Sequence, residues 1–379
     1  MNISRRSLLS RLAAGAVAGA AFNTVKDLAF AEGVPGAANS PAKPILLSRN
    51  ENAYGPSPKV LSAVQDAVLG CNRYPRTECD LLVNKIAALH RVRPEQVVLG
   101  CGASEILCMA GAATLGPGKK LVQASPTYPV LGEFARNLGA NVTNVPLNKM
   151  LEHDLDTMLA RCDASTGLVY ICNPNNPTGT LTQRKEIESF IRKLPATALV
   201  MIDEAYHGFV AGTSGYASFI DHPIDDDRVM VARTFSKIHG LAGMRIGYVV
   251  ASANVAMRLF PEPLRLGVSV VSARAAAAAI DDSEYVRMAA MRNANERQEF
   301  MNQVNARMLR ALESHTNFVM VNPLRPVNQV LEHLAQHNIV VAPRVAEMSK
   351  YLRVSLGTRP EMGQFWRVWD LMPPQKMAM

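Results

Sequence analysis

The sequence predicts an α/β protein with a mainly parallel, seven-stranded, doubly wound sheet, followed by a smaller α+β domain. The 379 residues are 48% hydrophobic, enough to bury the cores of two ordinary domains. From about residue 45 to residue 250, short apolar runs alternate with helical patterns, as in a parallel sheet joined by helical crossovers. Beyond residue 268 the pattern changes to an Ala-rich helix, a long polar helix and shorter strand-like runs.

Seven apolar runs supply the strands of the predicted sheet: Gln96–Gly100, Lys120–Gln123, Ala140–Val145, Gly167–Cys172, Ala198–Asp203, Val229–Thr234 and Ile246–Val250. In the smaller domain we expect helices at Ala273–Ile280 and on to about Leu312, and strands at Asn317–Val321, Ile339–Ala342 and Leu352–Leu356. Because ligands bind at the carboxyl ends of parallel strands, polar residues at those ends are the first candidates for a site. The predicted ranges are an export signal (1–31), a linker (32–44), an N-terminal arm (45–65), a large domain (66–267) and a small domain (268–379).

Residues 1–31 have the three regions of a signal peptide. Arg5 and Arg6 precede a modest apolar run over residues 12–22, and Ala29-Phe30-Ala31 resembles a cleavage site. The arginine pair resembles the twin-arginine type of bacterial signal, which exports folded proteins. The apolar run is too short to span a bilayer, so we expect a periplasmic protein without a stable membrane anchor. The alternative is a chance arginine pair on a short amphipathic helix.

Composition argues against a nucleic-acid partner and against a metal site. The net charge is +8, but four of the 40 Lys and Arg residues lie in the predicted signal, and no basic stripe with interleaved aromatics follows it. None of the six cysteines has metal-site spacing, and a domain of this size needs no disulfides. His333 and His337 lie four residues apart without a third ligand, which favours ordinary helix-surface histidines.

Lys237 is the most informative residue, because the segment Thr234-Phe235-Ser236-Lys237 closes an apolar strand. At a strand end in a cleft, desolvation and a neighbouring cation can remove the lysine's proton, leaving an amine that condenses with an aldehyde. The aldehyde cofactor that fits this chemistry is pyridoxal 5′-phosphate. Taken alone the lysine is a solvated charge, so the interpretation depends on partners for the rest of the cofactor.

Two strand ends supply partners for the cofactor ring. The run Leu199–Ile202 ends in Asp203, whose carboxylate can pair with a protonated pyridine nitrogen and keep the ring an electron sink. The alternative role for this Asp is to cap the next helix. Asn176, within the turn-rich segment Cys172–Gly179, and the hydroxyl of Tyr206 can donate to the phenolate oxygen. Turn formation alone also accounts for the Asn and Pro residues of that segment.

A phosphate site is predicted where Gly100–Glu105 leaves a strand and enters a helix. Small residues there let backbone N–H groups at the helix N-terminus face an anion. Arg245, with the hydroxyls of Thr234 and Ser236, supplies a fixed cation and further donors. Tyr128, just past a strand, can stack on the pyridine ring, and its alternative role is a core aromatic at a proline turn.

Arg353 lies inside an apolar strand-like run, where a cation must be paired. A bidentate hold on a substrate α-carboxylate is a role that arginine performs better than lysine, and a structural ion pair is the alternative.

As a set, these residues resemble the fold-type I, class I/II aminotransferases, most closely the histidinol-phosphate aminotransferase branch. The matching residues run in order and spacing from Asn50-Glu51-Asn52-Ala53-Tyr54-Gly55-Pro56-Ser57-Pro58 to Arg353 and Thr358. The resemblance implies the fold of that family, pyridoxal phosphate as cofactor, and ping-pong transfer of an amino group between an L-amino acid and a 2-oxo acid.

The resemblance also implies a role for each matching residue. Lys237 would bind the cofactor aldehyde as a Schiff base and later move a proton between the substrate Cα and the cofactor. The remaining cofactor contacts would come from Asp203, Asn176, Tyr206, Tyr128, the backbone amides of Ala103 and Ser104, Thr234, Ser236 and Arg245. Tyr54 would reach the phosphate of a neighbouring subunit, so a homodimer with two shared sites is expected.

This chain departs from the family pattern at three points. Ser104 stands where an acidic or larger polar residue is usual, and the cations that would bind a substrate phosphate are not evident. Arg344 is the candidate for holding the distal end of the substrate, with a solvated loop charge as the alternative. Histidine biosynthesis is cytoplasmic, so an exported relative points to another amino acid or a secondary-metabolite precursor.

Two rival functions remain at this stage. One is a decarboxylase, lyase or cyclase on the same scaffold, against which Arg353 argues because a carboxylate held by arginine is poorly placed to leave. The other is a two-lobed periplasmic binding protein without enzymatic activity, which has no need of a lysine at a strand end.

Overall fold

The computed structural model describes residues 43–210, 212–259 and 267–373. The predicted export signal (1–31) lies outside the described residues, as does the predicted linker (32–44) except for its last two residues. Within the described ranges, no helix is both long enough and apolar enough to cross a membrane.

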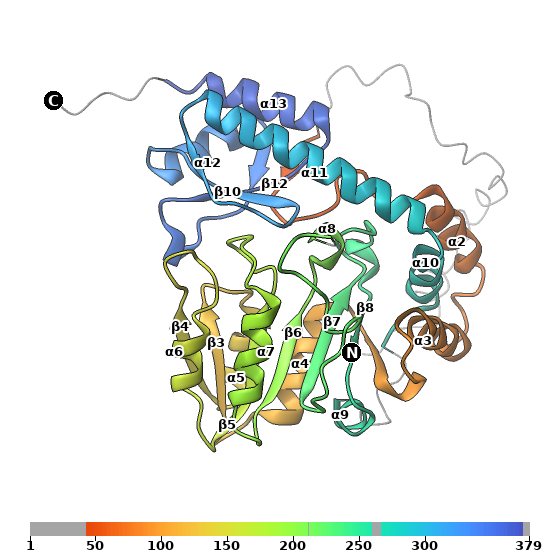
Figure 1. Ribbon diagram of the computed structural model, residues 1–379. Helices are drawn as coiled ribbons and strands as arrows, with labels where there is room; N and C mark the ends of the chain where they lie inside the picture. The colour runs from red at the N-terminus through yellow and green to blue at the C-terminus, as the bar shows by residue number, and fades with distance from the viewer. Residues whose placement is uncertain (1–42, 211, 260–266, 374–379) are drawn as a thin grey trace, which may run out of the picture. The chain divides into compact units, whose positions relative to one another are not determined.

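A seven-stranded sheet runs through the first part of the described chain, in the order β2-β8-β7-β6-β5-β3-β4 (Figure 1). Its strands are β2 (Val97–Gly100), β3 (Lys120–Ser125), β4 (Asn141–Pro146), β5 (Thr166–Cys172), β6 (Leu199–Asp203), β7 (Val229–Thr234) and β8 (Gly247–Val250). All neighbours pair in parallel except β8, which is antiparallel to both β2 and β7. The predicted number of strands and the mainly parallel arrangement are confirmed.

Helices cover both faces of this sheet and bury it completely at its centre (Figure 1). Successive residues of β5 alternate between two cores: Val169 and Ile171 belong to one, Leu168 and Tyr170 to the other. This alternation follows from the two-residue period of a strand, and burial on both faces explains why β5 is mainly apolar. The helices around the sheet are α3 (Arg76–His90), α4 (Ala103–Thr114), α5 (Val130–Asn137), α6 (Leu155–Ala160), α7 (Arg184–Lys193) and α9 (Ala253–Leu259), and the single-turn α8 (His207–Val210) follows β6.

The helix α10 (Val270–Ile280) belongs to the core of the large sheet. It packs against α2 (Pro58–Val68) and α3, and its alanines Ala273 and Ala276 are buried in the same core as β5. The change of sequence character at residue 268 therefore does not coincide with a change of core. From Pro44 onward the chain forms one compact unit, so the predicted domain ranges stay a prediction.

A separate core lies among the last helices and strands. Its elements are α11 (Ser283–Ala306), β9 (Arg310–Ala311), β10 (Phe318–Asn322), α12 (Val327–Gln336), β11 (Ile339–Val341), β12 (Leu352–Ser355) and α13 (Arg359–Asp370). The strands β12, β10 and β9 form an antiparallel sheet. The short N-terminal strand β1 (Ile45–Leu47) pairs in parallel with β11 in a separate two-stranded sheet, so the predicted arm joins this part of the structure.

The segment that follows β1 connects the two parts of the structure. The backbone N–H of Asn50 donates to Ser355 Oγ of β12 at 2.8 Å, and the Asn50 side chain donates to Tyr206 Oη, beyond β6, at 3.0 Å. Asn317 Nδ2 donates to the carbonyl oxygens of Asn50 and Glu51 at 3.0 and 3.1 Å. These bonds fix Asn50 at a left-handed φ of 54° and place its carbonyl near the carboxyl ends of the large sheet.

Candidate active site

A cavity of about 1050 Å³ lies at the carboxyl ends of the large sheet. Its lining brings together all but one of the residues singled out in the sequence: Ala103, Ser104, Tyr128, Asn176, Asp203, Tyr206, Thr234, Ser236, Lys237, Arg245, Arg344 and Arg353. The exception is Tyr54. The structure therefore brings these residues together around one cavity, while the role of each residue stays a prediction.

Lys237 follows the end of β7 and reaches into this cavity. Its Nζ donates to the carbonyl oxygens of Arg49 at 3.2 Å and Asn50 at 3.0 Å. Burial, together with the positive charge of Arg353, lowers the pKa of Lys237 to about 8. The amine is thus available near neutral pH for reaction with an aldehyde.

Asp203 is the last residue of β6 and is 2% exposed. Its Oδ2 accepts a hydrogen bond from the Tyr170 hydroxyl at 3.0 Å, and its Oδ1 accepts one from the backbone N–H of Ala205 at 3.0 Å. Burial raises the pKa of this carboxyl to about 6, despite both donors. The next helix, α8, begins only at His207, so Asp203 does not cap it. A buried carboxylate lining a cavity suits a cationic partner such as a protonated ring nitrogen.

Arg353, on β12, presents an unneutralised charge to the same cavity. Its Nη1 donates to Asn176 Oδ1 at 2.5 Å and its Nη2 to the Ser48 carbonyl at 3.2 Å, whereas its buried Nε has no partner. Among the residues that the structure describes, no carboxylate pairs with it, so the alternative of a structural ion pair is not seen there. A guanidinium in this state is ready to bind an incoming carboxylate.

The start of α4 and the side chain of Arg245 form a concave anion site that fits a phosphate. The N-cap residue Gly102 gives α4 no side-chain cap, so the first N–H groups of the helix have no partner within the helix. Arg245 donates to the carbonyl of Cys101 at 3.2 Å and to Ser236 Oγ at 3.4 Å. Gly102 has a φ of 78°, and a Cβ there would lie 2.4 Å from Arg245 Nη2. Only glycine lets the guanidinium approach the helix N-terminus so closely.

Hydroxyl groups complete this anion site. Thr234 Oγ1 donates to Ser236 Oγ at 2.9 Å, at the point where β7 ends. Tyr128 and Ser104 share a hydrogen bond of 3.0 Å between their hydroxyls, which places the Tyr128 ring in the cavity wall beside the start of α4. The donors of this site are thus of the type that a phosphate anion needs.

Two of the predicted residues lie away from these donors. Tyr54 is 41% exposed outside the cavity, with the Arg292 guanidinium 5.2 Å from the centre of its ring. Arg344 is exposed on the loop after β11, where it lines the cavity together with Glu133, Arg136 and Glu347.

Sequence reasoning missed two residues that fix the site. Asn50 lies in the segment that resembles the family, and the sequence gives it no role, although its carbonyl accepts from Lys237 and its side chain donates to Tyr206. Tyr170 was read only as part of an apolar strand, and its contact with Asp203 depends on the pairing of β5 with β6. A polar hydroxyl within an otherwise apolar strand was the only available signal for Tyr170.

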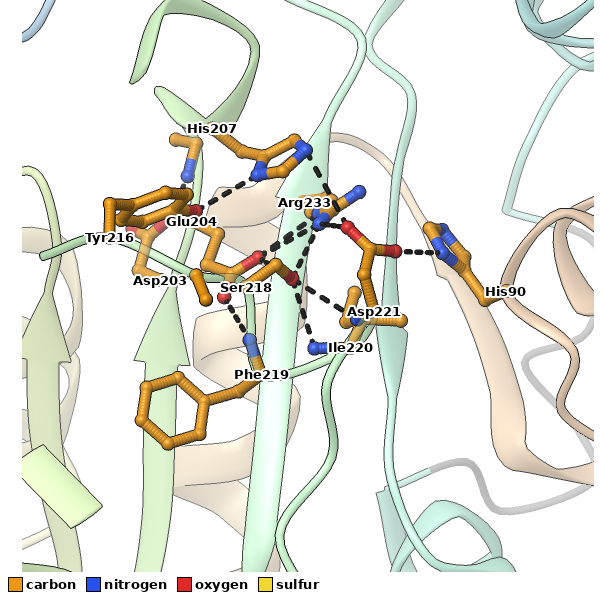
Figure 2. Close-up of polar contacts among 12 residues, drawn as sticks. His90, Asp203, Glu204, His207, Tyr216, Ser218, Phe219, Ile220, Asp221 and Arg233 are labelled. Carbon is orange, nitrogen blue, oxygen red and sulfur yellow. Dashed lines mark hydrogen bonds and ion pairs between the residues drawn. The ribbon is translucent and has the colours of Figure 1, made fainter. Parts of the chain in front are cut away.

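A polar network, in which Glu204 is buried and Asp221 is exposed, ties β6 to β7 (Figure 2). Glu204 follows Asp203, and its Oε2 accepts from Nε and Nη2 of Arg233, both at 3.1 Å. Arg233 also donates to Asp221 Oδ2 at 2.9 Å, and Asp221 Oδ1 lies 2.9 Å from His90 Nδ1. Because Arg233 directly precedes Thr234, this network holds together the strand ends that carry the ring and phosphate contacts.

Comparison with known proteins agrees with this geometry. The family model "Aminotransferase class I and II" matches residues 42–367. The chain is 34% identical to histidinol-phosphate aminotransferase 2 of Carboxydothermus hydrogenoformans over 84% of its length and 88% of that protein. It is 36% identical to the histidinol-phosphate aminotransferase of Staphylococcus carnosus over 74% of its length and 78% of that protein.

A comparison with a solved structure points to the same family. The histidinol-phosphate aminotransferase of Sinorhizobium meliloti, solved in complex with pyridoxal 5′-phosphate, superimposes with a TM-score of 0.80 at 28% identity, covering 86% of this chain and 91% of that one.

Proposed function

The chain belongs to the class I and II aminotransferases and is a pyridoxal phosphate-dependent aminotransferase of fold type I, and from this premise we propose which residues carry its reaction. Family membership also excludes the alternative that the chain is a two-lobed periplasmic binding protein without enzymatic activity. Amino acids and 2-oxo acids are the substrates that this family implies.

The residues in the cavity fit the cofactor. When bound, pyridoxal phosphate supplies an aldehyde for the amino group and a ring that delocalises the electron pair left on the substrate Cα. Asp203 would hold the ring nitrogen, Asn176 and Tyr206 would donate to the phenolate oxygen, and Tyr128 would stack on the ring. The backbone amides of Ala103 and Ser104 would bind the phosphate together with Thr234, Ser236 and Arg245.

Lys237 performs the chemistry that this chain itself contributes. Its neutral amine would hold the cofactor through the aldehyde, and with substrate bound the same amine would accept the proton from the substrate Cα and later return one. The observation that carries this proposal is the desolvated Nζ of Lys237, which shares a cavity with a buried carboxylate and an unpaired arginine.

Arg353 binds the acidic group of the substrate next to Cα and thereby favours transamination over decarboxylation. A carboxylate held by two guanidinium N–H groups stays charged and fixed, which opposes its departure as carbon dioxide. Arg344 holds the distal end of the substrate, at the rim of the cavity.

A comparison of amino donors tests the substrate. The full chain, loaded with pyridoxal phosphate, is mixed separately with histidinol phosphate and with aromatic, acidic and basic L-amino acids, and the visible absorbance of the bound cofactor is followed. If histidinol phosphate alone changes the absorbance of the bound cofactor, the substrate is the one after which the relatives are named. Selective discharge by an ordinary amino acid keeps the aminotransferase and rejects that substrate. Absence of discharge by every donor, with release of carbon dioxide or ammonia, favours the lyase alternative.

The role of Arg344 needs a separate variant. In Arg344→Gln, the KM of the selected donor rises while that of alanine, which has no distal group, stays the same. An equal change for both donors contradicts a distal contact.

We also propose that the protein is a homodimer in which Tyr54 contacts the cofactor phosphate bound by the partner subunit. The support is that Tyr54 is exposed and lies outside the cavity of its own chain, although the family resemblance gives it a phosphate contact.

Export to the periplasm through residues 1–31 is a further proposal, supported by the Arg5-Arg6 pair and the Ala29-Phe30-Ala31 site. Cell fractionation of the wild type and of an Arg5→Lys, Arg6→Lys variant tests it. We expect the shortened wild-type chain in the periplasm and the full-length variant in the cytoplasm; equal distribution of both would reject the signal.

A further inference from the structure

Tyr170 reaches Asp203 from the neighbouring strand, through the interior of the sheet. The strands β5 and β6 pair in parallel, with Tyr170 opposite Met201 and Cys172 opposite Asp203. The Tyr170 side chain is completely buried, and its hydroxyl donates to Asp203 Oδ2 at 3.0 Å. A tyrosine in an apolar sheet core carries a hydroxyl that needs a partner, and here the partner is the carboxylate at the cavity.

This hydrogen bond is one of two that the described residues make to the side-chain carboxylate of Asp203. Oδ1 accepts from the Ala205 backbone, which fixes one oxygen locally, whereas Oδ2 depends on Tyr170. An ionised carboxylate has about four acceptor positions, so both oxygens keep capacity for a partner in the cavity. Without the Tyr170 hydroxyl, Oδ2 has no protein donor and the carboxylate loses its restraint from β5.

We propose that Tyr170 is a positioning residue for the cofactor: its hydroxyl orients the Asp203 carboxylate and keeps it ionised for the pyridine nitrogen. This inference rests on the proposed role of Asp203. Tyr170 acts through Asp203 and is shielded from the cavity by the strand end.

The charges around Asp203 show why such a donor matters. Burial opposes the ionised form and, with a smaller contribution from the adjacent Glu204, raises the pKa of Asp203 to about 6. Tyr170, the Ala205 N–H and the positive charge of Lys237 lower it. The thiol of Cys172 and the hydroxyl of Tyr206 also face this carboxylate. Removing the Tyr170 hydroxyl therefore shifts the balance toward a protonated carboxyl, which pairs poorly with a pyridinium.

The test compares Tyr170→Phe with Tyr248→Phe as a matched control. Tyr248 is a buried tyrosine of the same sheet, on β8, and its hydroxyl binds His90 Nε2 at 2.8 Å instead of Asp203. Each chain, freed of cofactor, is titrated with pyridoxal phosphate and with its 1-deaza analogue, which has carbon in place of the ring nitrogen. Equilibrium affinities are measured, and thermal unfolding verifies that both variants fold.

The wild type should bind pyridoxal phosphate more tightly than the deaza analogue, because only the first has a nitrogen for Asp203. In Tyr170→Phe the preference for pyridoxal phosphate over the deaza analogue should shrink about tenfold, because one hydrogen bond to a charged group is lost. When the affinity of Tyr170→Phe for pyridoxal phosphate is measured against pH, the midpoint of the curve should also lie at a higher pH than in the wild type. Tyr248→Phe should keep the wild-type preference and midpoint.

Two different failures are distinguishable. If the wild type itself does not prefer pyridoxal phosphate, the proposed role of Asp203 is wrong and the role of Tyr170 falls with it. If the wild type and Tyr170→Phe show the same preference and the same pH midpoint, Asp203 needs no help from Tyr170 and this inference alone is overturned.

Discussion

Lys237 combines burial with nearby positive charge, and this sets the pH at which its amine reacts. Its pKa falls from an ordinary 10.5 to about 8, mainly because burial disfavours the ammonium form. The neutral amine is therefore the minor form below pH 8 and the major form above it.

This pKa gives a testable pH profile for cofactor capture. The rate at which the cofactor-free protein binds pyridoxal phosphate covalently should rise about tenfold per pH unit below pH 8 and level off above it. Stopped-flow absorbance measures this rate. A profile that continues to rise toward pH 10 would mean that Lys237 is solvated and not desolvated as described.

Asp203 opposes the stability of the cofactor-free fold. Its pKa rises from 3.8 to about 6, so the folded state holds its proton more tightly, and stability declines as pH rises through this range. The change corresponds to about 3 kcal/mol. At pH 7, Asp203→Asn without cofactor should be more stable than the wild type by up to about this amount, and near pH 3 the two should be similar.

Denaturant unfolding of both proteins at the two pH values measures this difference. The same substitution should weaken pyridoxal phosphate binding, since a neutral amide cannot pair with a pyridinium. An Asp203→Asn variant that is less stable than the wild type at pH 7 would contradict the account.

Residues at the ends of apolar runs were predictable from the sequence, and residues inside such runs were not. Asp203 and Lys237 stand out because a charged residue follows a buried strand. Tyr170 lies within a strand and looks like core, and its role depends on which strand pairs with β5. Asn50 depends on contacts more than 150 residues away along the chain, which no local pattern contains.

Among the elements, the packing of β8 against the start of α4 determines the phosphate site. A Cβ on Gly247 would lie 2.8 Å from the backbone nitrogen of Ala103 and 2.8 Å from the carbonyl oxygen of Arg233. Both are backbone atoms, so neither can move away without displacing its element. Glycine at this position lets the strand and the helix N-terminus lie in contact.

We expect Gly247→Ala to separate these two elements, at a cost of about 1–3 kcal/mol in stability. Its affinity for pyridoxal phosphate should fall more than its affinity for pyridoxal, which has no phosphate. Thermal unfolding and equilibrium titration measure both effects. Gly116→Ala is the matched control, because a Cβ there has no neighbour within 4 Å. Equal losses for the two ligands in Gly247→Ala would show that the phosphate site does not depend on this contact.

Most strands of the large sheet were predictable because they are short apolar runs, whereas β4 is largely polar and only Val145 of its six residues is buried. The position of α10 was not predictable. Its Ala-rich sequence fits any close helix packing, and only the structure shows that it lies against α2 and α3. The parallel pairing of β1 with β11 joins segments almost 300 residues apart, beyond the reach of sequence patterns.

For the whole molecule, the proposed homodimer makes cofactor binding depend on protein concentration. If Tyr54 of each subunit contacts the phosphate bound by the other, the affinity for pyridoxal phosphate should fall when the protein is diluted until it dissociates. The affinity of Tyr54→Phe should be lower in the dimer and should change less on dilution. Sedimentation at each concentration reports the oligomeric state; a wild-type affinity that is the same for monomer and dimer would exclude a contact across the interface.

The central claim is that this cavity transfers an amino group through Lys237. The most direct measurement is a single turnover of the cofactor-loaded protein with its selected amino donor and no 2-oxo acid, counting the products by mass spectrometry. The wild type should release one 2-oxo product per bound cofactor, and Lys237→Ala should be slower by about 10²–10⁴-fold. Carbon dioxide in place of the 2-oxo product, or equal product from Lys237→Ala, would contradict the claim.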